Sequence, residues 1–303
     1  MKVLVTGGAG FIGSHIVDKL IDNNYEVVVV DNLSTGNINN INPTAKFYNL
    51  DILHPDFETV FIEEHPYIVI HHAAQIDIQT SLKNPAFDAE VNILGTIRLL
   101  DYCTKYKVQK IIYASSAAVY GDPRYLGVDE KHPVAPISFY GVSKHTPEHY
   151  IKVFCHLTNM SYTILRYANV YGPRQDPKGE GGVVSIFTDK LLNNQAPVIF
   201  GDGEQTRDFI YVKDIATANL QALKRGNNEI MNISCNTQTT VNKLFSAMQK
   251  IVGKGTKPVF KDPRPGDIIH SYLDNTKAKK LLEWNPKFDL HEGLKETIEY
   301  YLD

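Results

Sequence analysis

Two side chains that could move a proton stand four residues apart in the sequence, Tyr140 and Lys144. On a helix this spacing places both on one face. A free tyrosine, with a pKa of about 10, is a poor base near neutral pH, but a nearby ammonium favours the phenolate. Such a phenolate could remove a proton from a substrate hydroxyl. The same spacing fits an ordinary surface pair, so it indicates a candidate base and leaves that alternative open.

A second set of hydroxyl groups follows an apolar run at residues 110–114. Ser115 and Ser116 stand where this run ends. If the run is a parallel strand, the two serines lie at its carboxyl end, where open α/β sheets bind ligands. A serine at this place could then form a hydrogen bond with the same substrate oxygen as the tyrosine, which strengthens the catalytic interpretation of Tyr140 and Lys144.

A glycine-rich turn lies near the amino terminus, with Gly7, Gly10 and Gly13 in a GxxGxxG pattern. Glycines in such a turn let the backbone approach a pyrophosphate and pack a helix closely on a strand. The helix that follows presents free N–H groups to the phosphates. Glycine-rich turns also join elements that bind nothing. The apolar strand before this one and the amphipathic helix after it favour dinucleotide binding.

A carboxylate, Asp31, ends the second apolar run. It could accept hydrogen bonds from both ribose hydroxyls of an adenosine and would repel a 2′-phosphate, so the sequence favours NAD over NADP. The alternative is a solvated aspartate that begins a turn with Asn32. Asp51 follows the third apolar run. It could contact the adenine amine, and it could equally well be a residue of a turn.

The elements that must position these residues alternate along the first half of the chain. Short β-branched runs, apolar on both faces, indicate buried parallel strands, and longer amphipathic stretches between them indicate helices. This alternation predicts an α/β fold with a doubly wound parallel sheet. We expect strands at residues 3–5, 26–30, 46–49, 67–71, 110–114 and 162–166, and helices at about 12–23, 55–64, 86–106 and 139–157.

The pattern changes after about Tyr171, where glycine and proline become frequent. We interpret residues 1–170 as the main domain and 171–303 as a smaller, mixed α/β lobe that binds substrate. The division is not expected to be clean, because a segment near 205–235, with a strand at about 229–234, should return to the main sheet. The last residues, 290–302, form a predicted amphipathic helix.

Composition excludes several other classes of protein. The 303 residues carry 31 basic and 34 acidic side chains, a net charge of −3, which gives no general attraction to nucleic acid or to acidic membranes. Hydrophobic residues make up 43%, so a disordered chain is excluded. No apolar run reaches the roughly 18–20 residues that span a bilayer. Three scattered cysteines indicate reduced thiols and a cytoplasmic protein.

Taken together, the glycine loop, Asp31, the SSxxVYG run from Ser115 and the YxxxK motif resemble the extended short-chain dehydrogenase/reductase superfamily. The resemblance is closest to the nucleotide-sugar 4-epimerases that act on UDP-glucose and UDP-galactose. It implies a Rossmann-like domain, bound NAD, and Ser116, Tyr140 and Lys144 as the catalytic residues. The NAD contacts that it implies are Gly7, Gly10, Phe11, Ile12, Gly13, Asp31, Asn32, Asp51, Ile52, Ala73, Ala74, Gln75, Asn92, Ser115, Tyr140, Lys144 and Tyr167.

The second half resembles the same family at the residues expected to bind a UDP-sugar. Two arginines, Arg207 and Arg264, would clamp the diphosphate, since a guanidinium pairs with phosphate oxygens through two hydrogen bonds. The residue seven positions after Arg264 helps to set the room at the sugar's 2-substituent, and here it is the small Ser271. N-acetylated sugars are therefore also expected to fit. The full set of implied substrate contacts is Ser116, Tyr140, Asn169, Val183, Val198, Phe200, Arg207, Arg264, Asp267 and Ser271.

The resemblance also implies a mechanism in which the 4-hydroxyl is oxidised, the 4-keto sugar turns over, and the ketone is reduced from the other face. Related 4,6-dehydratases and decarboxylases carry an acid beside the catalytic hydroxyl, whereas this chain has Ala117 and Ala118, which disfavours those reactions. A sensor that binds NAD without catalysis is a further alternative, disfavoured because both Tyr140 and Lys144 are present.

Two further expectations concern the helix that carries Tyr140. His145 to His149 spell the HxxEH pattern of zinc proteases, but Pro147 interrupts it, so no metal site is expected. Family members commonly pair this helix and the preceding one into a dimer interface. Five apolar residues fit such a face, and a place in the core would explain them equally well: Leu94, Ile97, Leu100, Tyr150 and Phe154.

Overall fold

The computed structural model describes residues 1–178, 182–253, 255–263 and 268–302 of the chain. Within these residues, the largest sheet has seven strands in the order β11-β6-β5-β4-β1-β2-β3, all paired in parallel. Its strands are β1 (Lys2–Thr6), β2 (Glu26–Asp31), β3 (Lys46–Asn49), β4 (Ile68–His71), β5 (Lys110–Ser116), β6 (Ser161–Tyr167) and β11 (Glu229–Ile233). The predicted doubly wound α/β sheet is confirmed.

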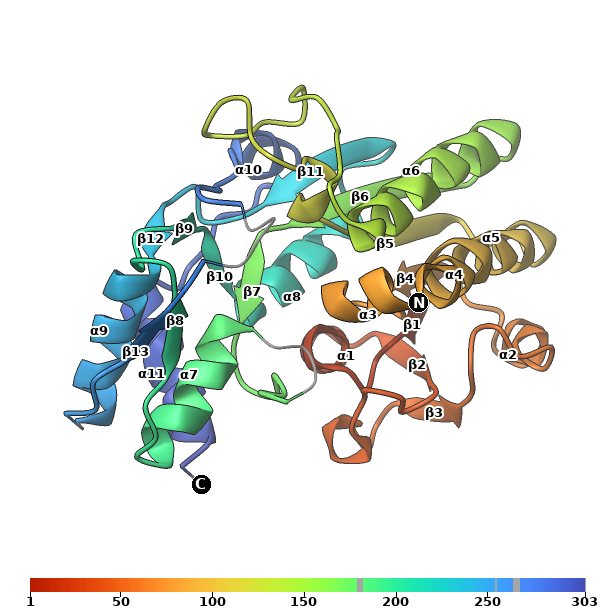
Figure 1. Ribbon diagram of the computed structural model, residues 1–303. Coiled ribbons are helices and arrows are strands. Elements are labelled where there is room, and N and C mark those ends of the chain that lie inside the picture. The colour runs from red at the N-terminus through yellow and green to blue at the C-terminus, as the bar shows by residue number, and fades with distance from the viewer. Residues whose placement is uncertain (179–181, 254, 264–267, 303) are drawn as a thin grey trace.

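Helices cover both faces of this sheet, as Figure 1 shows. Successive side chains of a strand point to opposite faces, so Val3 and Val5 pack on one side, with α1 (Phe11–Ile21), α8 (Val212–Ala222) and α10 (Thr276–Leu282). Leu4 packs on the other side, against α2 (Phe57–Glu64), α5 (Gly95–Lys105) and α6 (Phe139–Leu157). The sheet is therefore buried on both faces, as its continuous apolar runs predict.

The segment before α5 is more broken than a single helix over 86–106. It consists of α3 (Ile78–Lys83), α4 (Pro85–Ala89) and the π-helical turn η2 (Glu90–Leu94). The side chain of Asn84 accepts a hydrogen bond from Phe87 N, and Pro85 occupies the first helical position, so a new helix begins there. The π-turn contains the buried Asn92, in keeping with the frequent occurrence of such turns at functional sites.

A smaller part of the molecule has its own apolar core, at the left of Figure 1. Its short strand pairs join residues far apart in sequence: β7 with β10, β9 with β12, and β8 with β13. The elements are β7 (Asn169–Tyr171), β8 (Val198–Phe200), β9 (Thr206–Arg207), β10 (Phe209–Tyr211), β12 (Thr239–Thr240), β13 (Val259–Lys261), α7 (Val183–Leu192), α9 (Val241–Val252) and α11 (Leu290–Tyr300).

The chain crosses between the two parts more than once. β11 pairs with β6 at the edge of the main sheet, from Glu229 opposite Thr163 to Ile233 opposite Tyr167. Helix α8 before it and α10 after it pack into the main core. The main domain is therefore assembled from three separate stretches of sequence. Among the described residues, no helix combines the length and the apolar character needed to cross a membrane.

Candidate active site

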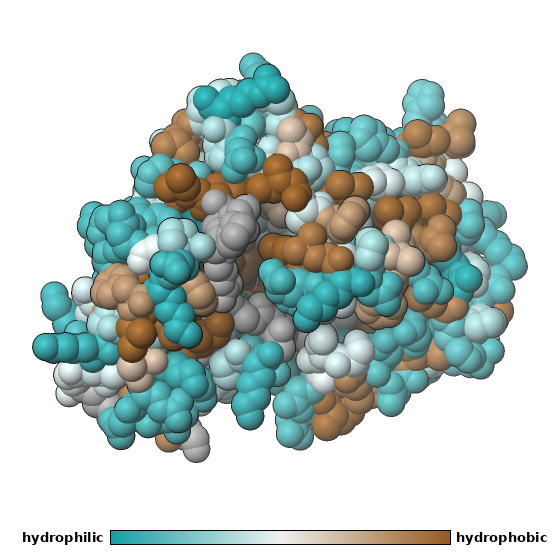
Figure 2. Space-filling view, in the orientation of Figure 1, coloured by the Kyte–Doolittle hydropathy of each residue, from teal (hydrophilic) through white to brown (hydrophobic). Residues whose placement is uncertain are grey.

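A cavity lies at the carboxyl ends of the parallel strands. Its volume is about 500 Å³, within the range of cofactor sites. The loops after β1 and β4 meet there, and the order of the sheet reverses between these two strands, so the cavity occupies the position where doubly wound sheets bind ligands. In the space-filling view, a hollow near the centre of this face separates the two parts of the molecule (Figure 2).

Glycines shape the inner end of this cavity because backbone atoms leave no room for side chains. A Cβ on Gly13 would lie 2.1 Å from the carbonyl oxygen of Gly7, and a Cβ on Gly7 would lie 2.6 Å from Ala73 N. Gly7 also has φ +72°, which favours glycine. Helix α1 begins directly after Gly10, which has no side chain to cap it. The first N–H groups of α1 therefore face a narrow cradle with the shape and polarity that a pyrophosphate needs.

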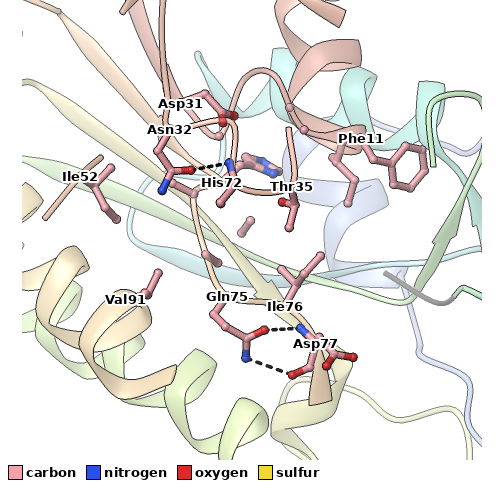
Figure 3. A pocket seen from close by; sticks show the side chains of 18 of the residues that line it. Phe11, Asp31, Asn32, Thr35, Ile52, His72, Gln75, Ile76, Asp77 and Val91 are labelled. Carbon is pink, nitrogen blue, oxygen red and sulfur yellow. Dashed lines mark hydrogen bonds between the residues drawn. The ribbon is translucent and has the colours of Figure 1, made fainter. Parts of the chain in front are cut away.

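Asp31 stands on the cavity wall at the end of β2, close to Asn32 (Figure 3). Its carboxylate accepts hydrogen bonds from Ala9 N at 2.9 Å and Leu33 N at 2.8 Å, which fix its orientation. Asn32 donates to Asp51 Oδ2 at 2.7 Å. Among the described residues that line the cavity, the one lysine or arginine is Lys144 on α6, so this end presents carboxylates that oppose a 2′-phosphate and suits the adenosine half of NAD.

The opposite wall is a loop held in place by buried amides. Gln75 forms two hydrogen bonds with the backbone of Asp77 (Figure 3), from Nε2 to Asp77 O at 3.0 Å and from Asp77 N to Oε1 at 2.6 Å. The side chain of Asn92 accepts a hydrogen bond from Gln75 N at 2.8 Å and donates one to Gln75 O at 2.9 Å. Asn92 is not among the residues that line the cavity. In this structure the Asn92 side chain holds the backbone of Gln75 from behind the loop, and its contact with NAD stays a prediction.

Helix α6 carries Tyr140 and Lys144 to the cavity wall. Ser138 starts this helix, its Oγ accepting from Gly141 N at 3.1 Å, and Tyr140 N donates to the buried Ser81 Oγ at 3.2 Å. The helix continues through Pro147 to Leu157. The hydroxyl of Ser81 thus ties the backbone of the candidate base to α3, a contact that the sequence pattern does not indicate.

The lysine is buried beneath this wall. Lys144 Nζ lies 4.8 Å from the centre of the Tyr113 ring. Burial lowers the pKa of Lys144 to about 8, and the carboxylates of Asp88 and Glu148 act in the opposite direction. The ammonium form still predominates at pH 7, so Lys144 can supply the positive charge that a phenolate at Tyr140 requires.

The two serines that follow the fifth strand have different surroundings. Ser115 lines the cavity, and its hydroxyl donates to Glu148 Oε1 at 2.6 Å. Ser116 caps the next turn, its Oγ accepting from Ala118 N at 3.2 Å. Ser116 is partly exposed but is not among the residues that line the cavity, while Ser115 is buried, so Ser116 has the more accessible hydroxyl of the two.

Most of the residues expected to contact NAD line this one cavity. Tyr167 closes it from β6, and its hydroxyl accepts from Asn219 Nδ2 at 2.8 Å and lies 3.2 Å from His72 Nε2. The sequence patterns did not single out several of the other wall residues, which are Ser34, Thr35, Leu53, Thr80, Phe87 and Val91. The expected residues on the wall are Gly7, Gly10, Phe11, Ile12, Gly13, Asp31, Asn32, Asp51, Ile52, Ala73, Ala74, Gln75, Ser115, Tyr140, Lys144 and Tyr167.

Apart from Ser116 on β5 and Tyr140 on α6, the described residues expected to bind the sugar nucleotide lie on the smaller part and are not among the lining residues of this cavity. Asn169 begins β7, and its backbone N–H donates to Asp208 O at 2.9 Å. Arg207 ends β9, and Ser271 N donates to Thr206 O at 3.2 Å, so Ser271 lies beside that strand. Val198 and Phe200 are in β8, and Val183 begins α7. Arg264 and Asp267 lie outside the described residues.

Comparison with known proteins agrees with this geometry. The model of the NAD dependent epimerase/dehydratase family matches residues 3–234. A putative UDP-glucose 4-epimerase of Methanocaldococcus jannaschii is 53% identical, over 98% of this chain and 97% of its own. The structure of the Thermotoga maritima UDP-glucose 4-epimerase with UDP-glucose is 48% identical with a TM-score of 0.98, covering 100% and 99% of the two chains.

A UDP-N-acetylglucosamine 4-epimerase from Methanobrevibacter ruminantium is 36% identical with a TM-score of 0.95, covering 99% of this chain and 98% of that one. The matches extend over both parts of the molecule. With its glycine cradle, its terminal Asp31 and its Tyr140–Lys144 pair on one cavity wall, the chain belongs to the NAD dependent epimerase/dehydratase family.

Proposed function

We propose that the protein is an NAD-dependent epimerase that interconverts UDP-glucose and UDP-galactose at C4 of the sugar. One observation carries the proposal: Tyr140 and Lys144 share a cavity with a dinucleotide cradle. The relatives named as UDP-glucose 4-epimerases, which match the chain over nearly its whole length, support the choice of substrate.

The cavity residues hold the cofactor in this proposal. The cradle at Gly7, Gly10 and Gly13 takes the pyrophosphate, and Asp31 takes the adenosine ribose. When bound, NAD supplies an acceptor for a hydride from C4, and the same hydride is returned to complete the reaction. Because the reaction has no net redox change, no second substrate is needed.

In this proposal, residues of α6 and β5 remove the proton of the substrate's 4-hydroxyl and later return it. The phenolate of Tyr140 removes the proton of the 4-hydroxyl, and Ser116 donates a hydrogen bond to the same oxygen. The ammonium of Lys144 favours the phenolate form. When the ketone is reduced from its other face, Tyr140 returns the proton to the oxygen. Each group therefore ends in its starting state.

The smaller part of the molecule binds the UDP group in this proposal. Asn169 and Arg207 contact the diphosphate, together with Arg264. Val198 and Phe200 border the uracil, near Asp267 and Val183. Support comes from the strand pairs β7–β10 and β9–β12, which hold Asn169 and Arg207 in a fixed frame.

The range of sugars is proposed to include N-acetylhexosamines. Ser271 is small and lies beside β9, which carries Arg207, and one structural relative is named as a UDP-N-acetylglucosamine 4-epimerase. Dehydration and decarboxylation are disfavoured because Ala117 and Ala118, next to Ser116, have no group that could carry a proton.

We also propose that two copies of the chain associate through α5 and α6. Of the five apolar residues considered for this face, Leu100 is buried in the core and Phe154 is partly buried against it, so they are not free for a partner. Leu94 at the end of η2, directly before α5, is exposed, and Ile97 on α5 is partly exposed. Tyr150, Val153 and Leu157 on α6 are exposed. Figure 2 shows apolar surface in the region where these helices lie. A self-complementary pairing of this face would bury it.

Two broader assignments follow the same proposal. Residues 1–170 form most of the NAD-binding domain, and 171–303 supply the UDP-sugar lobe together with the segments that return to the main sheet. The cysteines Cys103, Cys155 and Cys235 are free thiols, which suits a reducing, cytoplasmic location.

The test is to incubate the purified protein with UDP-galactose and to follow the anomeric proton by NMR. UDP-glucose should appear without net formation of NADH, and a parallel sample with UDP-GlcNAc should give UDP-GalNAc. Tyr140→Phe serves as the control that keeps the ring and removes the base. Absence of conversion in both samples, with NAD bound, would exclude the proposed activity.

A further inference from the structure

Asp88 is a carboxylate buried next to the candidate active site that no expected role uses. It belongs to α4 and is 1% exposed. Its Oδ1 accepts from Gln75 Nε2 at 2.7 Å and from Asn92 Nδ2 at 3.3 Å. Both donors are neutral amides, and Asp88 makes no salt bridge with any residue in the described ranges. A buried carboxylate with only neutral donors needs a cation nearby to offset the cost of its burial.

The cation that interacts with Asp88 is the ammonium of Lys144, which follows Ser143 on α6. Asn92 Nδ2 contacts both Asp88 Oδ1 and, at 2.9 Å, Ser143 Oγ. Ser143 precedes Lys144 on α6, so one amide nitrogen links α4 to the helix that carries the lysine. Lys144 is 4% exposed, and its interaction with Asp88 favours its charged form.

A second carboxylate near Lys144, Glu148, is already paired. It accepts two hydrogen bonds from Arg166, at 2.9 Å from Nε and 2.6 Å from Nη2, and a third from Ser115. Because the guanidinium neutralises it, its effect on Lys144 is partly cancelled. Asp88 has no such partner, so its full charge acts on the lysine through a medium that excludes water.

We infer that Asp88 is the buried counter-charge that keeps Lys144 protonated, and that its hydrogen bonds with Gln75 and Asn92 hold it in position for that role. Asp88 is therefore a positioning residue, since it acts through Lys144. The inference rests on the proposed function only for the catalytic use of Lys144. The charged or titratable groups around this lysine are Asp88, Glu148, Tyr140, Tyr113, His71 and His72.

The other groups do not substitute for Asp88. Burial lowers the pKa of His71 and of His72 to about 3, so both are neutral at pH 7 and neither competes as a cation. Burial raises the pKa of Tyr113 well above its usual range, so its ring remains a neutral phenol. Removal of the Asp88 charge therefore leaves a buried ammonium whose remaining carboxylate is shared with Arg166.

The test measures the protonation of Lys144 directly, by titrating lysine ¹⁵Nζ and ¹³Cε NMR signals of the full chain without substrate. Lys144→Ala assigns the signal. Asp88→Asn keeps the size and the acceptor oxygen but removes the charge, and we expect the pKa of Lys144 to fall by about 1. Lys110 is the internal control. It is also buried with a pKa lowered to about 8, yet it lies at the other end of β5, bonded to Arg225 O, and should not move.

Two variants separate charge from packing. Glu90→Gln removes an exposed carboxylate two residues away and should leave Lys144 unchanged. Asp88→Glu restores the charge and should restore the pKa at least partly. In the epimerisation assay, the alkaline limb of the kcat profile should move to lower pH in Asp88→Asn.

An unchanged Lys144 titration in folded Asp88→Asn would overturn the inference, whatever the activity. Equal shifts of Lys144 and Lys110 would also overturn it, because they would indicate a general change in folding. A shifted Lys144 without any epimerase activity in the unaltered protein would keep the inference and reject the proposed function.

Discussion

Arg166 and Glu148 form a two-pronged ion pair beneath the candidate active site, with Nε–Oε1 at 2.9 Å and Nη2–Oε2 at 2.6 Å. Both side chains are at most 4% exposed. The guanidinium also lies 4.8 Å from the centre of the Tyr120 ring. The pair joins β6 to α6, and Ser115 extends it to β5.

Removing the charge of one partner of this ion pair should lower the free energy of unfolding. Glu148→Gln leaves the Arg166 charge buried without a counter-charge, and we expect a loss of about 3–5 kcal/mol in the free energy of unfolding. Urea denaturation measures it. Glu299→Gln removes one partner of an exposed pair with Lys295 and should change stability by less than about 0.5 kcal/mol. Equal effects from the two variants would contradict the assigned importance of burial.

The glycine cradle predicts a steric effect. In Gly13→Ala the new methyl group would lie 2.1 Å from Gly7 O, so the loop must shift. We expect NAD affinity to fall at least tenfold, about 1.4 kcal/mol, as measured by calorimetry on protein freed of NAD. Gly255→Ala is the matched control, because no atom lies within 4 Å of its added methyl group. Unchanged affinity in Gly13→Ala would mean that the pyrophosphate binds elsewhere.

Asp31 should determine the choice between NAD and NADP. Asp31→Asn removes the charge opposed to a 2′-phosphate and weakens the ribose hydrogen bonds, so the ratio of NADP to NAD affinity should rise about tenfold. Binding titrations with both nucleotides measure this ratio. Asp51→Asn alters the neighbouring carboxylate, which accepts from Leu53 N at 2.7 Å. If Asp51 contacts only the adenine, its variant should weaken both nucleotides equally.

Buried histidines make stability depend on pH. Burial lowers the pKa of His71 to about 3, and the ring lies between Thr6 Oγ1 at 2.7 Å and Thr96 Oγ1 at 3.0 Å. In the unfolded chain the ring of His71 takes up a proton near pH 6.5, whereas in the folded protein it stays neutral until the pH is near 3. The stabilisation from neutral His71 is therefore complete above about pH 6.5 and decreases as the pH falls towards 3.

Urea denaturation between pH 7 and 4 should show this loss. His71→Gln should reduce the slope of unfolding free energy against pH by about 1.4 kcal/mol per pH unit, the contribution of one proton. His54→Gln, at an exposed site, should leave the slope unchanged. A slope that is the same in His71→Gln would show that the ring is protonated in the folded state.

Ser271 provides a prediction about substrate range. Ser271→Tyr should remove the activity with UDP-GlcNAc at least tenfold more strongly than that with UDP-galactose, because the larger ring fills the space at the 2-substituent. Steady-state kcat/KM with the two substrates measures the difference. Equal losses would indicate that Ser271 affects the lobe as a whole.

The strands of the main sheet could be predicted because they are buried on both faces. In the runs at Glu26–Val30 and Lys110–Ala114, residues 27–30 and 111–114 are hydrophobic without interruption, and the structure has strands there, extended to Asp31 and Ser116. The motifs at their ends follow from the same rule, since ligand-binding residues stand where parallel strands stop. The hydrogen bonds of Asn92 with the backbone of Gln75 could not be predicted in this way, because they join residues 17 positions apart and no sequence pattern marks them.

The smaller part could not be predicted in the same detail. Its strands are two or three residues long and pair with partners distant in sequence, such as β8 with β13, so no local period marks them. The apolar residues of η2 and α5 were also ambiguous. Leu94 and Leu100 have the same chemical type, and only packing makes one exposed and the other fully buried.

The return of β11 to the edge of the main sheet has a consequence for dissecting the molecule. A fragment that stops at residue 170 would lack α8, α10 and β11, and it would leave β6 as an open edge with Leu165 uncovered. Such a fragment should aggregate rather than bind NAD. An exchange of the sugar-binding part between relatives would have to replace several separate segments at once, because neither part of the molecule is continuous in the sequence.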